Sequence, residues 1–153
     1  MDKLTGLRSA KYVEKPPFDL GKPKTAAQRK GIAYERKVAR ALRLLVDGIA
    51  ISYHHGPWVE YEAQGRVRYG QPDIVVEFSD RVLVVECKLT HRLDINSKIK
   101  RFYRRLLRMI YPGKEVHCAQ VYRNHVASSK MAPGLEALLG QWPPSHILEV
   151  NHR

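Results

Sequence analysis

Two apolar segments separated by two polar residues constrain the fold of this chain more than any other feature. Residues 73–78 read DIVVEF and residues 81–88 read RVLVVECK, with Ser79 and Asp80 between them. Neither segment alternates apolar with polar residues, which is typical of central strands that are covered on both faces. A two-residue turn would join the two strands as a hairpin. The pattern therefore predicts a sheet whose middle strands are buried between layers of helices.

Helices that could cover such a sheet are predicted before and after the hairpin. Thr25, followed three residues later by Gln28, has the form of a capping box, and the helix that begins there is expected to reach about Val46. Its apolar residues recur at spacings of three and four. They are Ile32, Val38, Ala39, Leu42, Leu45 and Val46. A second amphipathic helix is expected over 95–110, before Pro112 and Gly113. Its expected inner stripe is Ile95, Ile99, Phe102, Leu106 and Met109.

The remaining periodicity completes an α/β domain. Further strands are expected at 49–54, 58–63, 116–123 and 146–150, with a short helix at 135–139. This order of elements predicts a central mixed β-sheet flanked by helices, without internal repeats. Residues 1–24 contain three prolines and scattered lysines, so we expect a basic, loosely packed N-terminal arm ahead of a single domain at 25–153.

The charge of the chain indicates a polyanionic partner. Lysine and arginine number 27 against 15 acidic residues, which gives a net charge of +12 over 153 residues. Such an excess favours nucleic acid as the partner, with an anionic membrane surface as the second candidate and a merely soluble basic protein as the third. The membrane is disfavoured because the second helix lacks a wide exposed apolar face.

The apolar segments and the cysteines bear on the compartment. The apolar runs are too short to span a bilayer, and no secretory signal core follows the N-terminus. Two cysteines cannot form a disulfide framework, and no zinc-ligand spacing accompanies them. We therefore expect Cys87 and Cys118 to be core residues of a protein of the reducing cytoplasm, or of the host cytoplasm if the protein is viral.

The hairpin brings two carboxylates together. With Ser79 and Asp80 as the turn, residue i pairs with residue 159 − i, which places Asp73 directly opposite Glu86. Strand alternation puts Lys88 on the same face as this pair. Directly opposed like charges destabilise a sheet unless a cation lies between them. The pair is therefore a candidate site for a divalent metal ion.

The first helix contributes a third acid. Glu35 lies three residues after Ile32 and three before Val38, on the apolar stripe rather than among the arginines. A carboxylate turned toward a core is costly unless it is paired or bound to a metal. We expect Glu35 to reach the Asp73–Glu86 pair, so that three acids and a lysine form a site suited to phosphodiester chemistry.

These residues resemble a known group of enzymes. Gln71-Pro72-Asp73, followed after twelve residues by Glu86-Cys87-Lys88, resembles the signature of the PD-(D/E)xK nuclease superfamily. The segment from Lys30 to Arg36, KGIAYER, resembles the helical segment that carries an additional glutamate there, and is most like that of archaeal-type Holliday junction resolvases. The resemblance extends from Thr25 to about Val121. It implies a restriction-endonuclease-like core and metal-dependent DNA cleavage.

The chemistry assigns a role to each residue of this site. Asp73, Glu86 and the backbone carbonyl of Cys87 are expected to hold Mg²⁺, for which Mn²⁺ would substitute. Lys88 is expected to orient or deprotonate the attacking water, and to offset charge on the transition state. Glu35 would act in the outer shell or toward a second metal, and the sequence leaves open one or two metals. His54, His55 and His91 are either exposed loop residues or catalytic.

Contacts to DNA are expected from two basic surfaces. The second helix carries basic residues without interleaved acids, which favours phosphate contacts over a merely solvated face. Those assigned to DNA are Lys98, Arg101, Arg104, Arg105 and Arg108. The first helix adds Arg36 and Arg40 to the expected DNA contacts, and Arg43 lies on the same side.

Taken together, the sequence predicts an Mg²⁺-dependent endonuclease that selects branched DNA, such as a Holliday junction in recombination and repair. Resolution of a junction requires two symmetric cuts, so a homodimer is expected. Another nuclease of the superfamily, such as an exonuclease or a restriction-type enzyme, is an alternative. A catalytically silent DNA-binding module with the same fold is the other.

Overall fold

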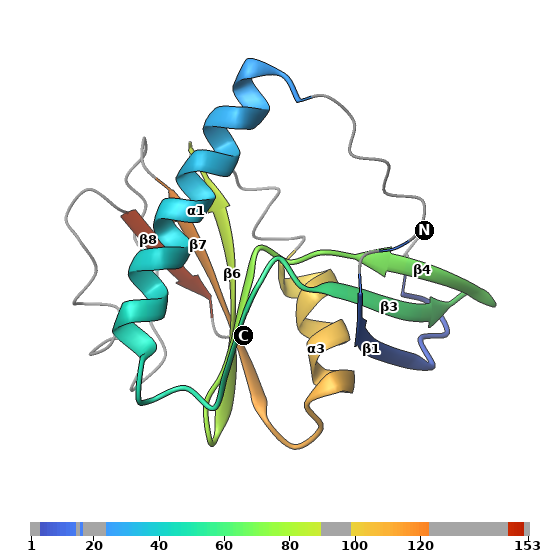
Figure 1. The fold of residues 1–153 in the computed structure, drawn as a ribbon. Coiled ribbons are helices and arrows are strands. Elements are labelled where there is room, and N and C mark those ends of the chain that lie inside the picture. The colour runs from blue at the N-terminus through green and yellow to red at the C-terminus, as the bar shows by residue number, and fades with distance from the viewer. Residues whose placement is uncertain (1–3, 15, 17–23, 90–98, 123–146, 152–153) are drawn as a thin grey trace.

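The protein is an α/β domain with two sheets in its computed structural model, which describes residues 4–14, 16, 24–89, 99–122 and 147–151 (Figure 1). The larger sheet has the strand order β2-β5-β6-β7-β8. These strands are β2 (Ser52–His55), β5 (Ile74–Glu77), β6 (Arg81–Lys88), β7 (Glu115–Tyr122) and β8 (Ile147–Asn151). The β6 and β7 strands are parallel and the other neighbours antiparallel, which confirms the predicted mixed sheet.

The β5–β6 hairpin has the predicted register. Ile74 lies opposite Val85 and Glu77 opposite Val82, and the Phe78 N–H donates to the Arg81 carbonyl at 2.8 Å across the turn. The six residues 82–87 of β6 are all buried. This strand is therefore covered on both faces, as its continuous apolar sequence predicted.

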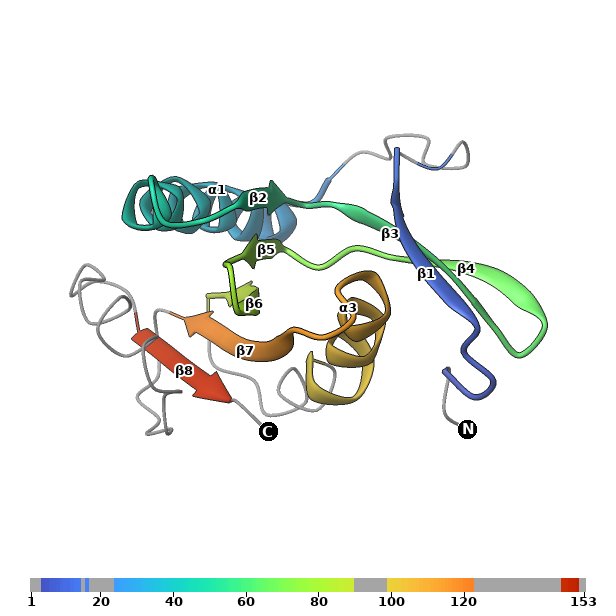
Figure 2. The same cartoon turned by 90° about the horizontal axis from the view of Figure 1, so that it is seen from below.

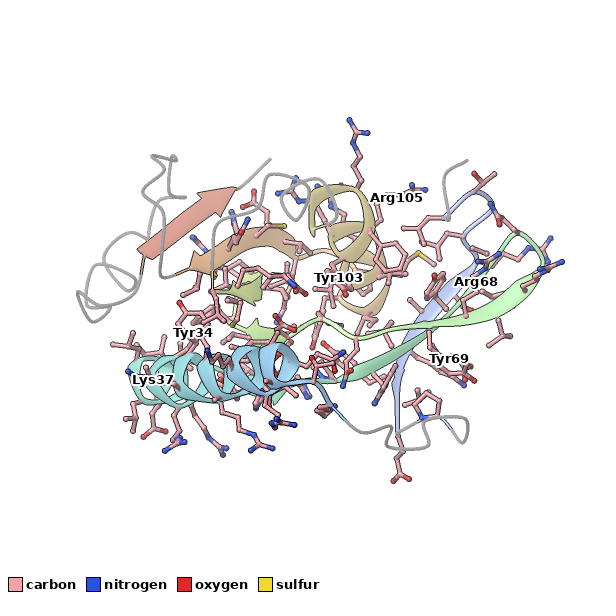
Figure 3. The ribbon with its side chains drawn as sticks, turned by 90° about the horizontal axis from the view of Figure 1, so that it is seen from above. Tyr34, Lys37, Arg68, Tyr69, Tyr103 and Arg105 are labelled. Carbon is pink, nitrogen blue, oxygen red and sulfur yellow. The ribbon has the colours of Figure 1, made fainter. Side chains whose placement is uncertain are left out.

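Helix α1 (Ala26–Val46) covers one face of this sheet (Figure 2). The Thr25 hydroxyl accepts from the Gln28 N–H at 3.1 Å, and the Gln28 side chain accepts from the Thr25 N–H at 2.8 Å. This capping box satisfies two backbone donors that the first helical turn leaves without partners, and it confirms the predicted start. Tyr34 lies between α1 and the sheet (Figure 3). The fully buried positions also include Val38, Ala39, Leu42 and Val46, while Ile32 and Leu45 are half-buried.

The opposite face of the five-stranded sheet packs against a second helical segment. It begins as a π-helix, η1 (Ile99–Tyr103), and continues as the short α-helix α3 (Arg104–Ile110). A three-stranded antiparallel sheet lies on the far side of α3 (Figure 2). Its order is β1-β3-β4, formed by β1 (Ser9–Val13), β3 (Trp58–Ala63) and β4 (Arg66–Gly70). The helix is therefore enclosed between two sheets.

The inner stripe predicted for the second helix is wrong in part. Leu106 is buried as expected, but Tyr103, Arg104 and Leu107 are buried with it, and Met109 is 39% exposed. The reason is the π-helical start, because a π-turn holds more residues than an α-turn and rotates every later side chain relative to an α-helical pattern.

The N-terminal region also differs from the prediction. Ser9–Val13 pairs with β3 as strand β1, and Leu4 is completely buried, so this part of 1–24 is packed rather than a loose arm. Its apolar residues pack against β3 and α3, which are distant in sequence, so the sequence did not reveal this packing. The β4 strand was also missed, although residues 66–69 alternate polar and apolar side chains, because the glycines at 65 and 70 indicate turns. The predicted helix at 135–139, and Lys98 and His91, lie outside the described residues.

Candidate active site

The two carboxylates of the hairpin meet where β5 begins and β6 ends. Asp73 immediately precedes β5, and Glu86 lies near the end of β6, in the positions that the register makes opposite. The Asp73 N–H donates to Glu86 Oε1 at 3.2 Å, and Asp73 Oδ2 accepts from the Cys87 N–H at 2.7 Å. Backbone donors thus fix Asp73 between the two strands, as the hairpin arithmetic predicted.

Glu35 extends from α1 to this strand end. Burial and the neighbouring Asp73 carboxylate raise the pKa of Glu35, while the hydrogen bond from His55 opposes the rise. The His55 Nε2 atom lies 2.8 Å from Glu35 Oε2. Glu35 is therefore brought to Asp73, as predicted, and the two like charges repel each other without a cation between them.

An open depression gives solvent access to these two acids. It has a volume of about 400 Å³. Its lining includes both carboxylates and Lys88, together with Lys24, Gln28, Gly31, Ile32, Cys87 and Leu89. Its walls are the N-terminal half of α1 and the ends of the hairpin strands. This carboxylate depression combines two acids and a lysine, which is a suitable environment for a cation and a phosphate together.

Glu86 lies behind the depression rather than in it. Its side chain is only 3% exposed. Strand alternation puts Glu86 on the face of Val82 and Val84, toward η1. Burial raises the pKa of Tyr103 on this side, and the charges of Glu86 and Asp73 add to the rise. The expected convergence of three acids on one face is therefore wrong in part. Glu35, Asp73 and Lys88 line the depression, whereas Glu86 lies behind it and contacts Asp73 through the Asp73 N–H.

Cys87 points to the α1 side of the sheet and is 8% exposed. Burial raises the pKa of its thiol well above the ordinary value, and the charges of Asp73, Glu35 and Glu86 raise it further. A thiol in this state is a neutral core group rather than a nucleophile or a metal ligand. Cys118 is also buried and free, so both cysteines pack as predicted.

Within the described residues, no group of three or more histidine, cysteine, aspartate or glutamate side chains is arranged to hold a metal ion. Magnesium does not require such a cage, because it is commonly bound by one or two carboxylates together with water and substrate phosphates. Asp73 and its carboxylate neighbours meet that smaller requirement. The donor set is hard oxygen, which suits Mg²⁺ or Mn²⁺ better than zinc.

The basic residues of the second helix do not form the predicted surface. Arg104 is only 4% exposed, so its guanidinium faces the core and cannot lie along a phosphate backbone. Arg105 is half-buried, and its Nη2 atom donates to the Leu4 carbonyl at 3.3 Å. Only Arg101 and Arg108 of the predicted set are exposed among the described residues. The π-helical start that rotates the stripe is again the cause.

The histidines separate into two kinds. His54 packs against Tyr12, with ring centroids 4.7 Å apart and the rings tilted by 36°. His55, in contrast, reaches the carboxylate depression through Glu35. The sequence gave His55 only as one of three candidate histidines. The pairing of β2 with β5 places His55 opposite Ile74, next to Asp73, and so distinguishes it from His54.

Comparisons with known proteins give little information on this chain. No family model and no curated protein matches it. A crystal structure of protein VC1899 from Vibrio cholerae is similar over 54% of this chain and 22% of that chain, at 13% sequence identity and a TM-score of 0.42. A likeness of this extent carries no argument about function. The helices in the described parts of the chain are all too short or too polar to cross a membrane.

Proposed function

We propose that this protein is a divalent-metal-dependent deoxyribonuclease of the PD-(D/E)xK type, built on a restriction-endonuclease-like core. The observation that carries the proposal is the placement of Asp73 opposite Glu86 in the β5–β6 hairpin, with Glu35 beside Asp73. Acids in this arrangement repel one another, and their concentration at one strand end in a chain of net charge +12 has no evident structural benefit.

A divalent cation fits the donor set. Burial and the repulsion from Asp73 raise the pKa of Glu35, and positive charge placed between the two carboxylates would relieve the repulsion. Asp73 and the Cys87 carbonyl are the proposed ligands at the depression, with Glu35 in an outer position or toward a second metal. Glu86, which lies behind the depression, supports Asp73 by accepting its backbone N–H. A bound Mg²⁺ supplies polarisation of the scissile phosphate and acidification of a water molecule.

The remaining residues of the depression have complementary roles. Lys88 lines the same depression as Asp73, so its ammonium can orient the attacking water and offset charge on the phosphate in the transition state. His55 holds Glu35 by a hydrogen bond and thereby positions the carboxylate next to Asp73.

Branched DNA is the proposed substrate, and a homodimer the proposed active form. Both follow from the resemblance to junction resolvases together with the basic charge. A four-way junction requires two symmetric cuts, which two copies of a single site supply.

A cleavage panel tests the proposal. The full chain is incubated with Mg²⁺ or Mn²⁺ and with linear duplex, single strands, flaps or four-way junctions, alongside the Asp73→Asn and Lys88→Ala variants. We expect metal-dependent cleavage of junctions by the parent and none by either variant.

The other outcomes separate the alternatives. Equal degradation of linear duplex would assign the chain to an exonuclease or restriction-type nuclease. Binding without cleavage of any substrate would indicate a catalytically silent DNA-binding module. Cleavage that survives in Asp73→Asn would refute the site.

A further inference from the structure

A second, smaller hollow lies next to the carboxylate depression on the same helix. It has a volume of about 200 Å³. Three arginines of one side of α1 line it, with an aromatic and a histidine from β2. The lining residues are Arg36, Ala39, Arg40, Arg43, Tyr53 and His55. We refer to it as the arginine hollow.

The charge of the arginine hollow is not neutralised by protein acids. Within the described residues, none of its three guanidinium groups forms an ion pair with a carboxylate. Arg43 instead lies over the Tyr53 ring, at 5.7 Å from its centroid. Glu35 is the only acid of α1, and it is engaged by His55. Three positive charges thus surround a concave surface that contains no acidic side chain.

The arginine hollow and the carboxylate depression are connected by the hydrogen bond between His55 and Glu35. His55 lines the arginine hollow, and its Nε2 atom bonds to Glu35, which lines the carboxylate depression. The imidazole of His55 therefore lies between the two concave surfaces, and Arg36 directly follows Glu35 along the helix. A ligand that extends past His55 would contact both.

We propose that the arginine hollow binds a backbone phosphate of the same nucleic acid strand whose scissile phosphate lies at Asp73. This inference rests on the proposed function, and it adds a phosphate subsite next to the reaction centre. The planar guanidinium of arginine has paired N–H donors that bind two phosphate oxygens at once, and arginine is enriched at phosphate-binding sites. The hollow is large enough to hold a phosphate group. The strand would therefore follow α1, rather than α3 where Arg104 is buried.

Two double variants of α1 test the subsite. Arg36→Ala with Arg40→Ala removes two charges from the hollow. Lys30→Ala with Lys37→Ala removes two exposed charges from the same helix, and Lys37 is labelled on it in Figure 3. Each residue of a helix is rotated by about 100° from the last, so this control pair is directed away from the hollow. Binding of a labelled single strand and of a duplex is measured in EDTA over a salt series.

We expect the arginine pair to lower the magnitude of the log-affinity against log-salt slope by up to about 1.8 on duplex and about 1.4 on single strands, since each phosphate contact contributes about 0.9 or 0.7. The lysine pair should change the slope much less. Equal effects of the two pairs would indicate a diffuse positive face and overturn the subsite. So would a slope that neither pair changes.

A charge-conserving variant separates a shaped site from charge alone. Arg36→Lys with Arg40→Lys keeps both charges and removes both guanidinium forks. We expect a several-fold loss of affinity in this variant at an almost unchanged slope. Parent-like affinity would overturn the claim that the hollow is built for phosphate.

Because no metal is present in this experiment, its result is independent of cleavage. A positive result with no cleavage in the substrate panel would keep the subsite and reject the nuclease. Cleavage without the predicted slope change would reject only the subsite.

Discussion

Asp73 is expected to have two separable functions, and two substitutions distinguish them. Its carboxylate is the proposed metal ligand, and its Oδ2 atom also accepts the Cys87 N–H at 2.7 Å. Asp73→Asn keeps a carbonyl oxygen that can accept this bond but removes the charge. Asp73→Ala removes both. Each variant should therefore lose cleavage, but only the alanine should lose stability.

The magnitude follows from the burial of the donor. Cys87 is 8% exposed, so Asp73→Ala leaves a buried N–H without its partner, which costs about 1–3 kcal/mol. For a chain of this length, 1 kcal/mol corresponds to about 2–4 °C in Tm, so we expect a loss of about 2–12 °C. Asp73→Asn should stay within about 1 kcal/mol of the parent, because loss of the repulsion with Glu35 offsets the weaker acceptor.

The assay combines thermal and urea unfolding, followed by circular dichroism, with junction cleavage in Mg²⁺. Affinity for DNA in EDTA provides the control, and it should be unchanged or increased in Asp73→Asn, since a negative charge that faces phosphate is removed. Near-parent turnover by Asp73→Asn would refute the site. Equal stability of the alanine and asparagine variants would refute the role assigned to the Cys87 hydrogen bond.

Three further predictions concern residues around this centre. Burial and the Asp73 carboxylate raise the pKa of Glu35 in the folded protein. Ionised Glu35 therefore destabilises the folded state above this raised pKa, and the destabilisation disappears once the pH is below the ordinary pKa of a glutamate. Glu35→Gln should therefore be as stable as the parent or more stable at pH 7.5 in urea unfolding, with a difference that shrinks toward pH 4, and should lose activity; a large loss of stability with activity kept would make Glu35 structural. His55→Ala should lower cleavage and change its dependence on Mg²⁺ concentration, because Glu35 loses its positioning bond; identical metal titrations of variant and parent would exclude that role. Arg104→Ala should lower the free energy of unfolding by about 1–3 kcal/mol without changing the salt slope of DNA binding. Arg101→Ala, at an exposed position, should leave stability unchanged. The reverse pattern would contradict the observed burial of Arg104.

The sequence by itself determined the elements that depend on neighbouring residues. The start of α1 depends on bonds between Thr25 and Gln28, three residues apart, and the structure confirms it. The opposition of Asp73 and Glu86 follows from the two-residue turn at Ser79 and Asp80, since a hairpin's register is set by its turn. These interactions are local, so the order of residues is enough to predict them.

Only the tertiary structure decided which side chains face the site. The pairing of β2 with β5 brings His55 to Glu35, twenty residues away in sequence, and no local pattern specifies that contact. The π-helical start of the second helix rotates Arg104 into the core, against the α-helical periodicity that placed it on the surface. Strand β1 packs because β3 offers it an edge, although its own sequence carries little signal. Packing between distant segments decides such features, because burial of apolar surface stabilises whichever local conformation best fills the space between the two sheets.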